Sequence, residues 1–115
     1  MTPQDFRRMA LSLPESIEKA HMGHPDFRVC GKIFATLAYP DESVGMVKLT
    51  PEQQAACVKA EPDVFVPVKG KWGLGGATHV RLAKVKKPSL QRALVTAWRN
   101  TAPKTLVGPY EPESH

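Results

Sequence analysis

The chain has 115 residues and a formal net charge of +5, with 42% hydrophobic and 23% charged residues. This composition supplies enough apolar side chains for one small core and excludes wholesale disorder. No apolar run reaches the roughly 20 residues that a membrane-spanning helix needs, and the first residues lack the basic-then-apolar order of a signal peptide, so we expect a cytoplasmic protein without membrane contact.

The first predicted element is an amphipathic helix that begins at Pro3. Thr2 can cap it, Pro3 fits its first turn, and Asp5 favours the positive end of the helix dipole. Pro14 is expected to stop the helix. The apolar residues between them recur at helical spacing and form one stripe: Phe6, Met9, Ala10 and Leu13.

Short segments of β character follow, separated by turn residues. Gly31 lies between two of them and predicts a hairpin, whereas residues 22–26 indicate a loop and residues 40–43 a turn. The expected strands cover residues 16–21, which form the weakest candidate, 27–30, 32–39 and 44–49.

A second helix is expected from Pro51 to about Ala60. Thr50 can cap this helix, as Thr2 caps the first. Gln53 at the third helical position can complete a capping box, because its side chain can reach back to the backbone of the cap residue.

Two further strands are expected on either side of a loop that contains four glycines. Residues 64–68 alternate in the manner of a strand, and Pro67 favours an edge position because proline cannot donate a hydrogen bond to a neighbouring strand. In residues 78–83, aliphatic and polar side chains alternate. If the aliphatic set faces the core, His79 and Arg81 face the other way.

The last helix starts at Pro88 and ends before Pro103. It shows the clearest amphipathic pattern in the chain, with apolar residues at Leu90, Ala93, Leu94, Ala97 and Trp98. Residues 108–115 have no core pattern. We therefore expect a single domain over residues 1–107 and a frayed C-terminal tail.

The predicted order is one helix, three or four strands, a helix, two strands and a helix. Helices that are separated from runs of strands predict the α+β class. We expect a two-layer α/β arrangement with an antiparallel sheet and helices on one face.

Charge is divided unevenly along the chain. Residues 1–63 carry seven Lys/Arg and nine Asp/Glu, whereas residues 64–115 carry nine Lys/Arg and two Asp/Glu. A basic, glycine-rich loop that bears a tryptophan suits a polyanion, although a solvated basic hairpin whose tryptophan packs onto the sheet is the competing interpretation. The candidate nucleic-acid-binding residues, taken to share one face, are Lys69, Lys71, Trp72, His79, Arg81, Lys84, Lys86 and Lys87.

Other kinds of site find little support. The glycines do not form the phosphate-binding loop of nucleotide hydrolases, and the spacing of His21, His24 and Asp26 supplies no complete metal site. Cys30 and Cys57 lie in apolar or alternating segments, so we expect both to be reduced and partly buried. No catalytic constellation is found, and we expect no enzyme activity, metal or cofactor.

Four segments match a family pattern in their order along the chain: residues 12–15, 31–35, 71–82 and 97–104. The second reads Gly-Lys-Ile-Phe-Ala, and together they resemble the MmcQ/YjbR family of small bacterial proteins from about Phe6 to Lys104. Another branch of that family has Asn-Lys-x-His-Trp at the loop. Residues 68–72, Val-Lys-Gly-Lys-Trp, lack that Asn and His, so these positions are not carried over.

The resemblance implies a two-layer fold similar to frataxin-like and secretion-chaperone-like domains, and it implies DNA binding. Together with the charge pattern it predicts a small cytoplasmic module that binds nucleic acid weakly, with low sequence selectivity, through its C-terminal basic face. Two alternatives stay open: a protein-interaction module for an acidic partner, and a binder of small anions or metabolites.

Overall fold

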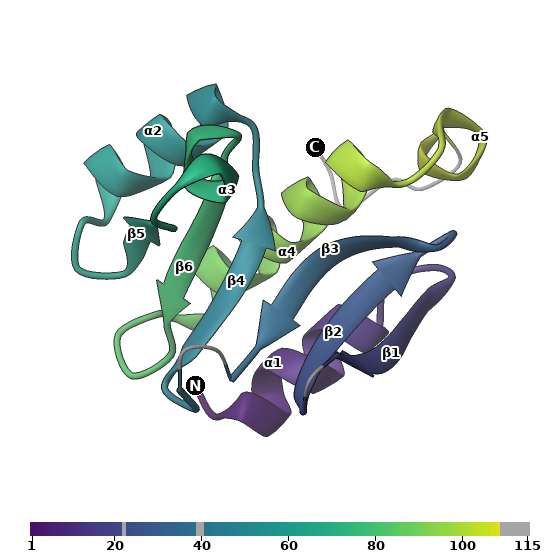
Figure 1. Ribbon diagram of the computed structural model, residues 1–115, viewed down its shortest axis with the longest axis horizontal. Coiled ribbons are helices and arrows are strands. Elements are labelled where there is room, and N and C mark those ends of the chain that lie inside the picture. The colour runs from purple at the N-terminus through teal and green to yellow at the C-terminus, as the bar shows by residue number, and fades with distance from the viewer. Residues whose placement is uncertain (22, 39–40, 109–115) are drawn as a thin grey trace.

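The computed structural model describes residues 1–21, 23–38 and 41–108. The predictions made for Met22, Tyr39, Pro40 and the tail from residue 109 lie outside these ranges. A six-stranded antiparallel sheet carries helices on one face, with strand order β1-β2-β3-β4-β6-β5 (Figure 1). In chain order the elements are α1 (Pro3–Leu11), β1 (Ser16–His21), β2 (His24–Val29), β3 (Lys32–Leu37), β4 (Val44–Lys48), α2 (Pro51–Ala60), β5 (Phe65–Pro67), α3 (Lys71–Leu74), β6 (Ala77–Arg81), α4 (Lys87–Thr101) and α5 (Lys104–Val107).

α1, α2 and α4 form one layer and the sheet forms the other. In Figure 1, α1 and α4 lie behind the sheet, where α1 contacts β1 and β3 and α4 contacts β3 and β4. α2 packs on β5 and β6. We call the opposite surface of the sheet the outer face. The predicted α+β class and two-layer arrangement are confirmed. Within the described ranges, no helix is both long and apolar enough to cross a membrane.

The structure differs from the predicted element order at three places. Residues 24–26, expected in a loop, belong to β2, because their pairing with β1 overrides the local turn signal of Gly23 and Pro25. The glycine-rich loop contains the helical turn α3. A further short helix, α5, follows Pro103, which is its N-cap residue.

Capping boxes begin both α1 and α2; the sequence predicts the one at α2, and the one at α1 goes beyond the predicted Thr2 cap. Thr2 Oγ1 accepts a hydrogen bond from the Asp5 backbone N–H at 3.1 Å, and the Asp5 carboxylate accepts one from the Thr2 N–H at 2.9 Å. Thr50 and Gln53 make the same two bonds at 3.1 and 2.9 Å. These pairs satisfy N–H groups that a helix start leaves without partners, so the predicted starts of both helices are confirmed.

The core lies between the sheet and the two helices behind it. The predicted stripe of α4 is confirmed, because every one of its members is buried: Leu90, Ala93, Leu94, Ala97 and Trp98. Trp98 also donates its indole N–H to the Pro14 carbonyl at 3.0 Å. A Cβ on Gly45 would lie 2.5 Å from the Phe6 ring, so the glycine lets α1 approach β4 closely.

The two strands of the basic half lie where the sequence predicts them. β5 pairs with β6 at the end of the sheet, so Pro67 is in an edge strand. On β6, Thr78 and Val80 are buried, whereas Arg81 is exposed and His79 half-buried. The predicted orientation of His79 and Arg81 toward the outer face is confirmed.

The glycine-rich segment is a closely packed helical turn. A Cβ on Gly73 would lie 1.5 Å from the Val68 carbonyl oxygen. A Cβ on Gly76 would lie 1.9 Å from the Leu49 carbonyl oxygen. Gly76 also has a φ of +114°, which favours glycine. The glycines therefore allow close backbone approach, whereas the sequence pattern predicts an open loop.

The burial prediction for one cysteine is wrong. Cys30 is exposed, because it belongs to the two-residue turn between β2 and β3. Its φ is +50° and that of Gly31 is +83°, and two successive positive values are typical of a type I′ hairpin turn. Cys57 is partly buried, as predicted, and both cysteines are free.

Leu94→Ala should lower the free energy of unfolding by about 2–5 kcal/mol, because it leaves a cavity where a side chain is almost fully buried. Denaturant titration measures the change. Gln91→Ala, at an exposed position of the same helix, is the control and should change stability by less than about 0.5 kcal/mol. An unchanged midpoint for Leu94→Ala would show that α4 does not pack by this stripe.

Gly73→Ala should cost about 1–3 kcal/mol of stability, because the new methyl group forces the backbone at Val68 to move. Gly75→Ala is the matched control, since its φ is −83° and its Cβ would have no neighbour closer than 3.6 Å. Thermal melts of the two variants test the packing. Equal melting temperatures would contradict the close approach at Gly73.

Candidate functional site

The eight predicted site residues do not share one continuous face. Lys69, Lys71 and Trp72 precede β6, and we call them the α3 group; Lys84, Lys86 and Lys87 follow it. β6 spans five residues, so the two groups are separated by roughly 15 Å of strand. In Figure 1 the segments that carry the two groups lie at opposite ends of β6. His79 and Arg81 belong to β6 itself.

His79 lies on the outer face opposite Met46 and Val66. Burial lowers the pKa of its imidazole from the ordinary value of 6.5. The side chain is therefore neutral at pH 7, so it can donate or accept a hydrogen bond there but does not add to the positive charge.

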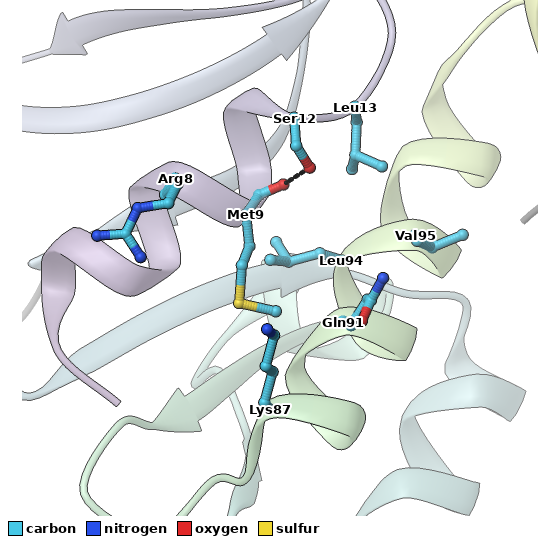
Figure 2. A pocket seen from close by; sticks show the side chains of 8 residues that line it. All are labelled: Arg8, Met9, Ser12, Leu13, Lys87, Gln91, Leu94 and Val95. Atoms are coloured by element: carbon cyan, nitrogen blue, oxygen red, sulfur yellow. Dashed lines mark hydrogen bonds between the residues drawn. The ribbon is translucent and has the colours of Figure 1, made fainter.

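Lys87 lies in the helical layer and lines a hollow of about 250 Å³ between α1 and α4. Figure 2 shows Met9 and Leu94 meeting across this hollow, with the Lys87 ammonium beside the Met9 thioether. Arg8 points away from it and pairs with Asp5 at 3.2 Å. The hollow is thus a mainly apolar seam between two packed helices, on the side of the sheet opposite the α3 group.

A larger hollow opens where β3 and β4 separate. Their pairing stops at Ala35 and Val47, whereas β2 and β3 remain paired as far as Lys32. The register of β2 and β3 shifts between Phe27 and Arg28, a bulge that bends the hairpin. The β2–β3 hairpin and the end of β4 consequently diverge at the top of Figure 1, and the C-terminal end of α4 lies behind the opening.

This opening, which we call the Trp72 hollow, has a volume of about 460 Å³. It brings together β2, the hairpin turn, β3, the end of β4, α3 and the end of α4. Its lining residues are Arg28, Gly31, Lys32, Ile33, Lys48, Trp72, Asn100 and Thr101. None of these is acidic, so the hollow presents cations, amide and hydroxyl groups and one indole.

Trp72 lies at the boundary of this hollow with 51% of its surface exposed. The Lys48 ammonium lies 5.7 Å from the centre of the indole ring, within the range of a cation–π contact. About half of the side chain is therefore covered by the protein and half is open, and the choice between a packing and a stacking tryptophan stays a prediction. The indole keeps enough open surface for another flat group.

Side-chain amides fix the elements around Trp72. The Gln54 amide donates to the backbone carbonyls of Gly73 at 3.0 Å and Ala77 at 2.9 Å, and so connects α2 to α3 and to the start of β6. The Asn100 amide donates to the Lys48 carbonyl at 3.1 Å, which connects α4 to the end of β4. The indole and the Lys48 ammonium are thus carried on elements with defined positions.

The cations of this hollow differ in whether they form an ion pair within the described residues. Arg28 donates from Nε and Nη2 to the two carboxylate oxygens of Asp26, at 2.9 and 3.1 Å, and this carboxylate is almost fully buried. The hydrogen bonds to Asp26 raise the pKa of Arg28 further. Lys32 and Lys48 are exposed and form none of the ion pairs that join residues in the described ranges.

Sequence reasoning missed Arg28, Lys32, Lys48 and Asn100. Strand alternation alone would have placed Lys48 on the face opposite Val47. Alternation could not predict which strands pair with β4 or where β3 separates from it. Strand pairing depends on contacts between residues that are far apart in the chain.

The described part of the chain offers little support for a metal site or a cysteine nucleophile. It contains no group of three or more His, Cys, Asp and Glu side chains that could hold a metal ion. Burial raises the pKa of the Cys57 thiol, and the charge of Glu61 adds to this, so the thiol is protonated at neutral pH. A protonated thiol is a weak nucleophile.

Comparisons with known proteins identify relatives by family and by fold. A family model described as YjbR matches residues 11–100. The crystal structure of Deinococcus radiodurans protein DR2400, described with a DUF419 domain, superposes with a TM-score of 0.71 and 21% identity, covering 97% of this chain and 84% of that one. At this identity the likeness shows the fold alone. No curated protein matches the chain.

Acidification should destabilise the protein partly through His79. Because burial lowers the folded-state pKa of His79, the unfolded chain takes up the proton first as the pH falls, and stability declines below about pH 6.5. Above that pH both states are neutral at this site. Between about pH 7.5 and about pH 5.5, the urea concentration at the midpoint of unfolding should therefore fall less for His79→Gln than for the parent protein. Equal losses in parent and variant would contradict the burial of the imidazole.

Proposed function

The chain belongs to the YjbR family, and we propose that it is a small cytoplasmic binding module that holds nucleic acid through cations of its outer face and adjoining loops. Binding draws mainly on phosphates, so affinity is modest and sequence selectivity low. The proposed module has no enzyme activity of its own. In the cytoplasm its two free cysteines would stay reduced.

The observation that supports this proposal most strongly is uncompensated positive charge. No acidic residue occurs between Asp63 and Glu111, a stretch that holds nine Lys/Arg. Ion pairs among the described residues use Arg7, Arg8 and Arg28 as their cations, all near the N-terminus. The cations of the basic half therefore remain available to an external polyanion.

Exposed cations of the basic half lie at both ends of β6, an arrangement that suits phosphates. Lys69 and Lys71 lie at one end of β6, Arg81 at its other end, and Lys84 and Lys86 just beyond it, all of them exposed. A phosphate backbone has regularly spaced charges and can contact cations at both ends of a short strand. Folded acidic proteins or small anions would engage fewer of these sites at once.

Binding to a short DNA duplex should weaken steeply with salt. With about three to five phosphates neutralised, the slope of log K against log salt should be about −3 to −5. Fluorescence anisotropy at several salt concentrations measures it. A slope near zero, or no binding at low salt, contradicts nucleic-acid binding. Polyglutamate that competes as well as DNA would favour an acidic protein partner instead.

Replacing Lys69 and Lys71 together by Ala should weaken DNA binding and reduce the salt slope by about one for each phosphate that the variant no longer neutralises. Thermal stability should barely change, because both lysines are exposed. The charge-matched control is Lys59→Ala with Lys104→Ala, two exposed lysines on α2 and α5. If both double variants lose affinity equally, binding depends on net charge and not on the α3 group.

A further inference from the structure

We propose that the Trp72 hollow accepts one unpaired nucleotide, so that the protein prefers single-stranded over duplex nucleic acid. This inference rests on the proposed function and specifies the form of nucleic acid. Trp72 stacks on the base, and Lys32 and Lys48 contact the phosphates on either side of it. Asn100 and Thr101 line the same hollow. Their polar groups already bond within the protein, the Asn100 amide to the Lys48 carbonyl and Gln53 and the Thr101 hydroxyl to the Ala97 carbonyl, so these two residues shape the wall.

The indole is the part of the hollow that selects an unpaired base. Trp72 keeps 51% of its surface exposed even though Lys48 lies beside its ring. Tryptophan residues in folded proteins are usually more deeply buried. Bases inside a duplex have both faces covered by their neighbours and offer only edges to a protein. A flat aromatic ring can therefore stack on a base only where that base has left the helix or was never paired.

The charges around the indole match the rest of a nucleotide. Lys32 and Lys48 are exposed, and no acidic side chain lines the hollow. Arg28 is turned toward its buried partner Asp26, so its guanidinium mainly completes the wall. One ammonium group beside the aromatic ring and a second lining the same hollow are suited to a base with flanking phosphates. A purely apolar ligand would leave these charges without partners.

The size and rigidity of the hollow also suit this occupant. Its volume of about 460 Å³ lies within the range of about 300–1,000 Å³ that is typical of small-ligand pockets. Backbone contacts at Gly73 and the Gln54 hydrogen bonds hold the α3 turn, and the Asn100 bond holds the end of β4. A nucleotide would thus meet a surface that is already arranged, which reduces the entropic cost of binding.

The hollow between α1 and α4 is a weaker candidate for the same role. Its walls are mainly Met9, Leu13 and Leu94, and Lys87 is its one cation without an ion pair among the described residues. It has no aromatic side chain. It therefore lacks the group on which a base would stack.

The test compares three fluorescent ligands of defined form at low salt: a short oligothymidylate, a hairpin duplex with a similar number of phosphates, and a labelled thymidine monophosphate. The parent protein should bind the single strand about tenfold more tightly than the duplex. Trp72→Ala should weaken single-strand binding by about tenfold and change duplex binding by less than about twofold. Trp72→Phe, which keeps a flat ring, should fall between parent and Ala.

Leu74→Ala is the matched control, because Leu74 belongs to the same helical turn, is 80% exposed and does not line the hollow. It should bind all three ligands as the parent does. Intrinsic fluorescence gives a second readout. Single-strand binding should quench the emission of the parent but not that of Trp72→Phe, whose remaining tryptophan, Trp98, is fully buried.

The outcomes separate this inference from the proposed function. Equal binding of single strand and duplex, with no effect of Trp72→Ala, overturns the inference and leaves electrostatic nucleic-acid binding intact. Failure of both polymers to bind at low salt overturns both. If thymidine monophosphate binds as tightly as the strand, the hollow is a site for free nucleotides and the preference for strands is wrong.

Discussion

Two glycines allow backbone segments to approach more closely than any side chain would permit, and the arrangement of the outer face depends on this contact. Gly73 lies against the Val68 carbonyl, and Gly76 lies against that of Leu49 at the end of β4. Because β4 and β6 are neighbours in the sheet, the turn between these glycines is held beside the end of β4. Trp72 is thereby placed next to Lys48, and an exposed indole becomes part of a basic site instead of a loop tip.

The second determinant of the site is the point at which β3 and β4 separate. If pairing continued to the end of both strands, backbone would fill the space that the Trp72 hollow occupies. The bulge beside Arg28 bends the β2–β3 hairpin away, while the buried stripe of α4 keeps the helix packed against both strands. The core thus stays closed on the helical side, and the opening appears on the outer face. This is how one short sheet combines a stable core with an accessible site.

Local signals are sufficient to predict most of the fold. Thr2 and Thr50 start their helices because capping depends on residues close together in the chain, and the stripe that ends at Trp98 has the helical period. β2 is predicted too short, because Pro25 looks like a turn residue until β1 pairs with it. The Trp72 hollow is only partly predictable. Its tryptophan lies in the conspicuous basic loop, but Lys32 and Lys48 come from the acidic half of the chain and join it only through tertiary contacts.

The most direct test of nucleic-acid binding through the outer face is an amide chemical-shift titration with a short single-stranded oligonucleotide. It reports binding and location in one experiment and needs no variant. The account predicts shifts at Lys32, Lys48 and the segment from Lys69 to Arg81, with small changes in the seam between α1 and α4. Shifts confined to that seam, or none at low salt, would contradict it.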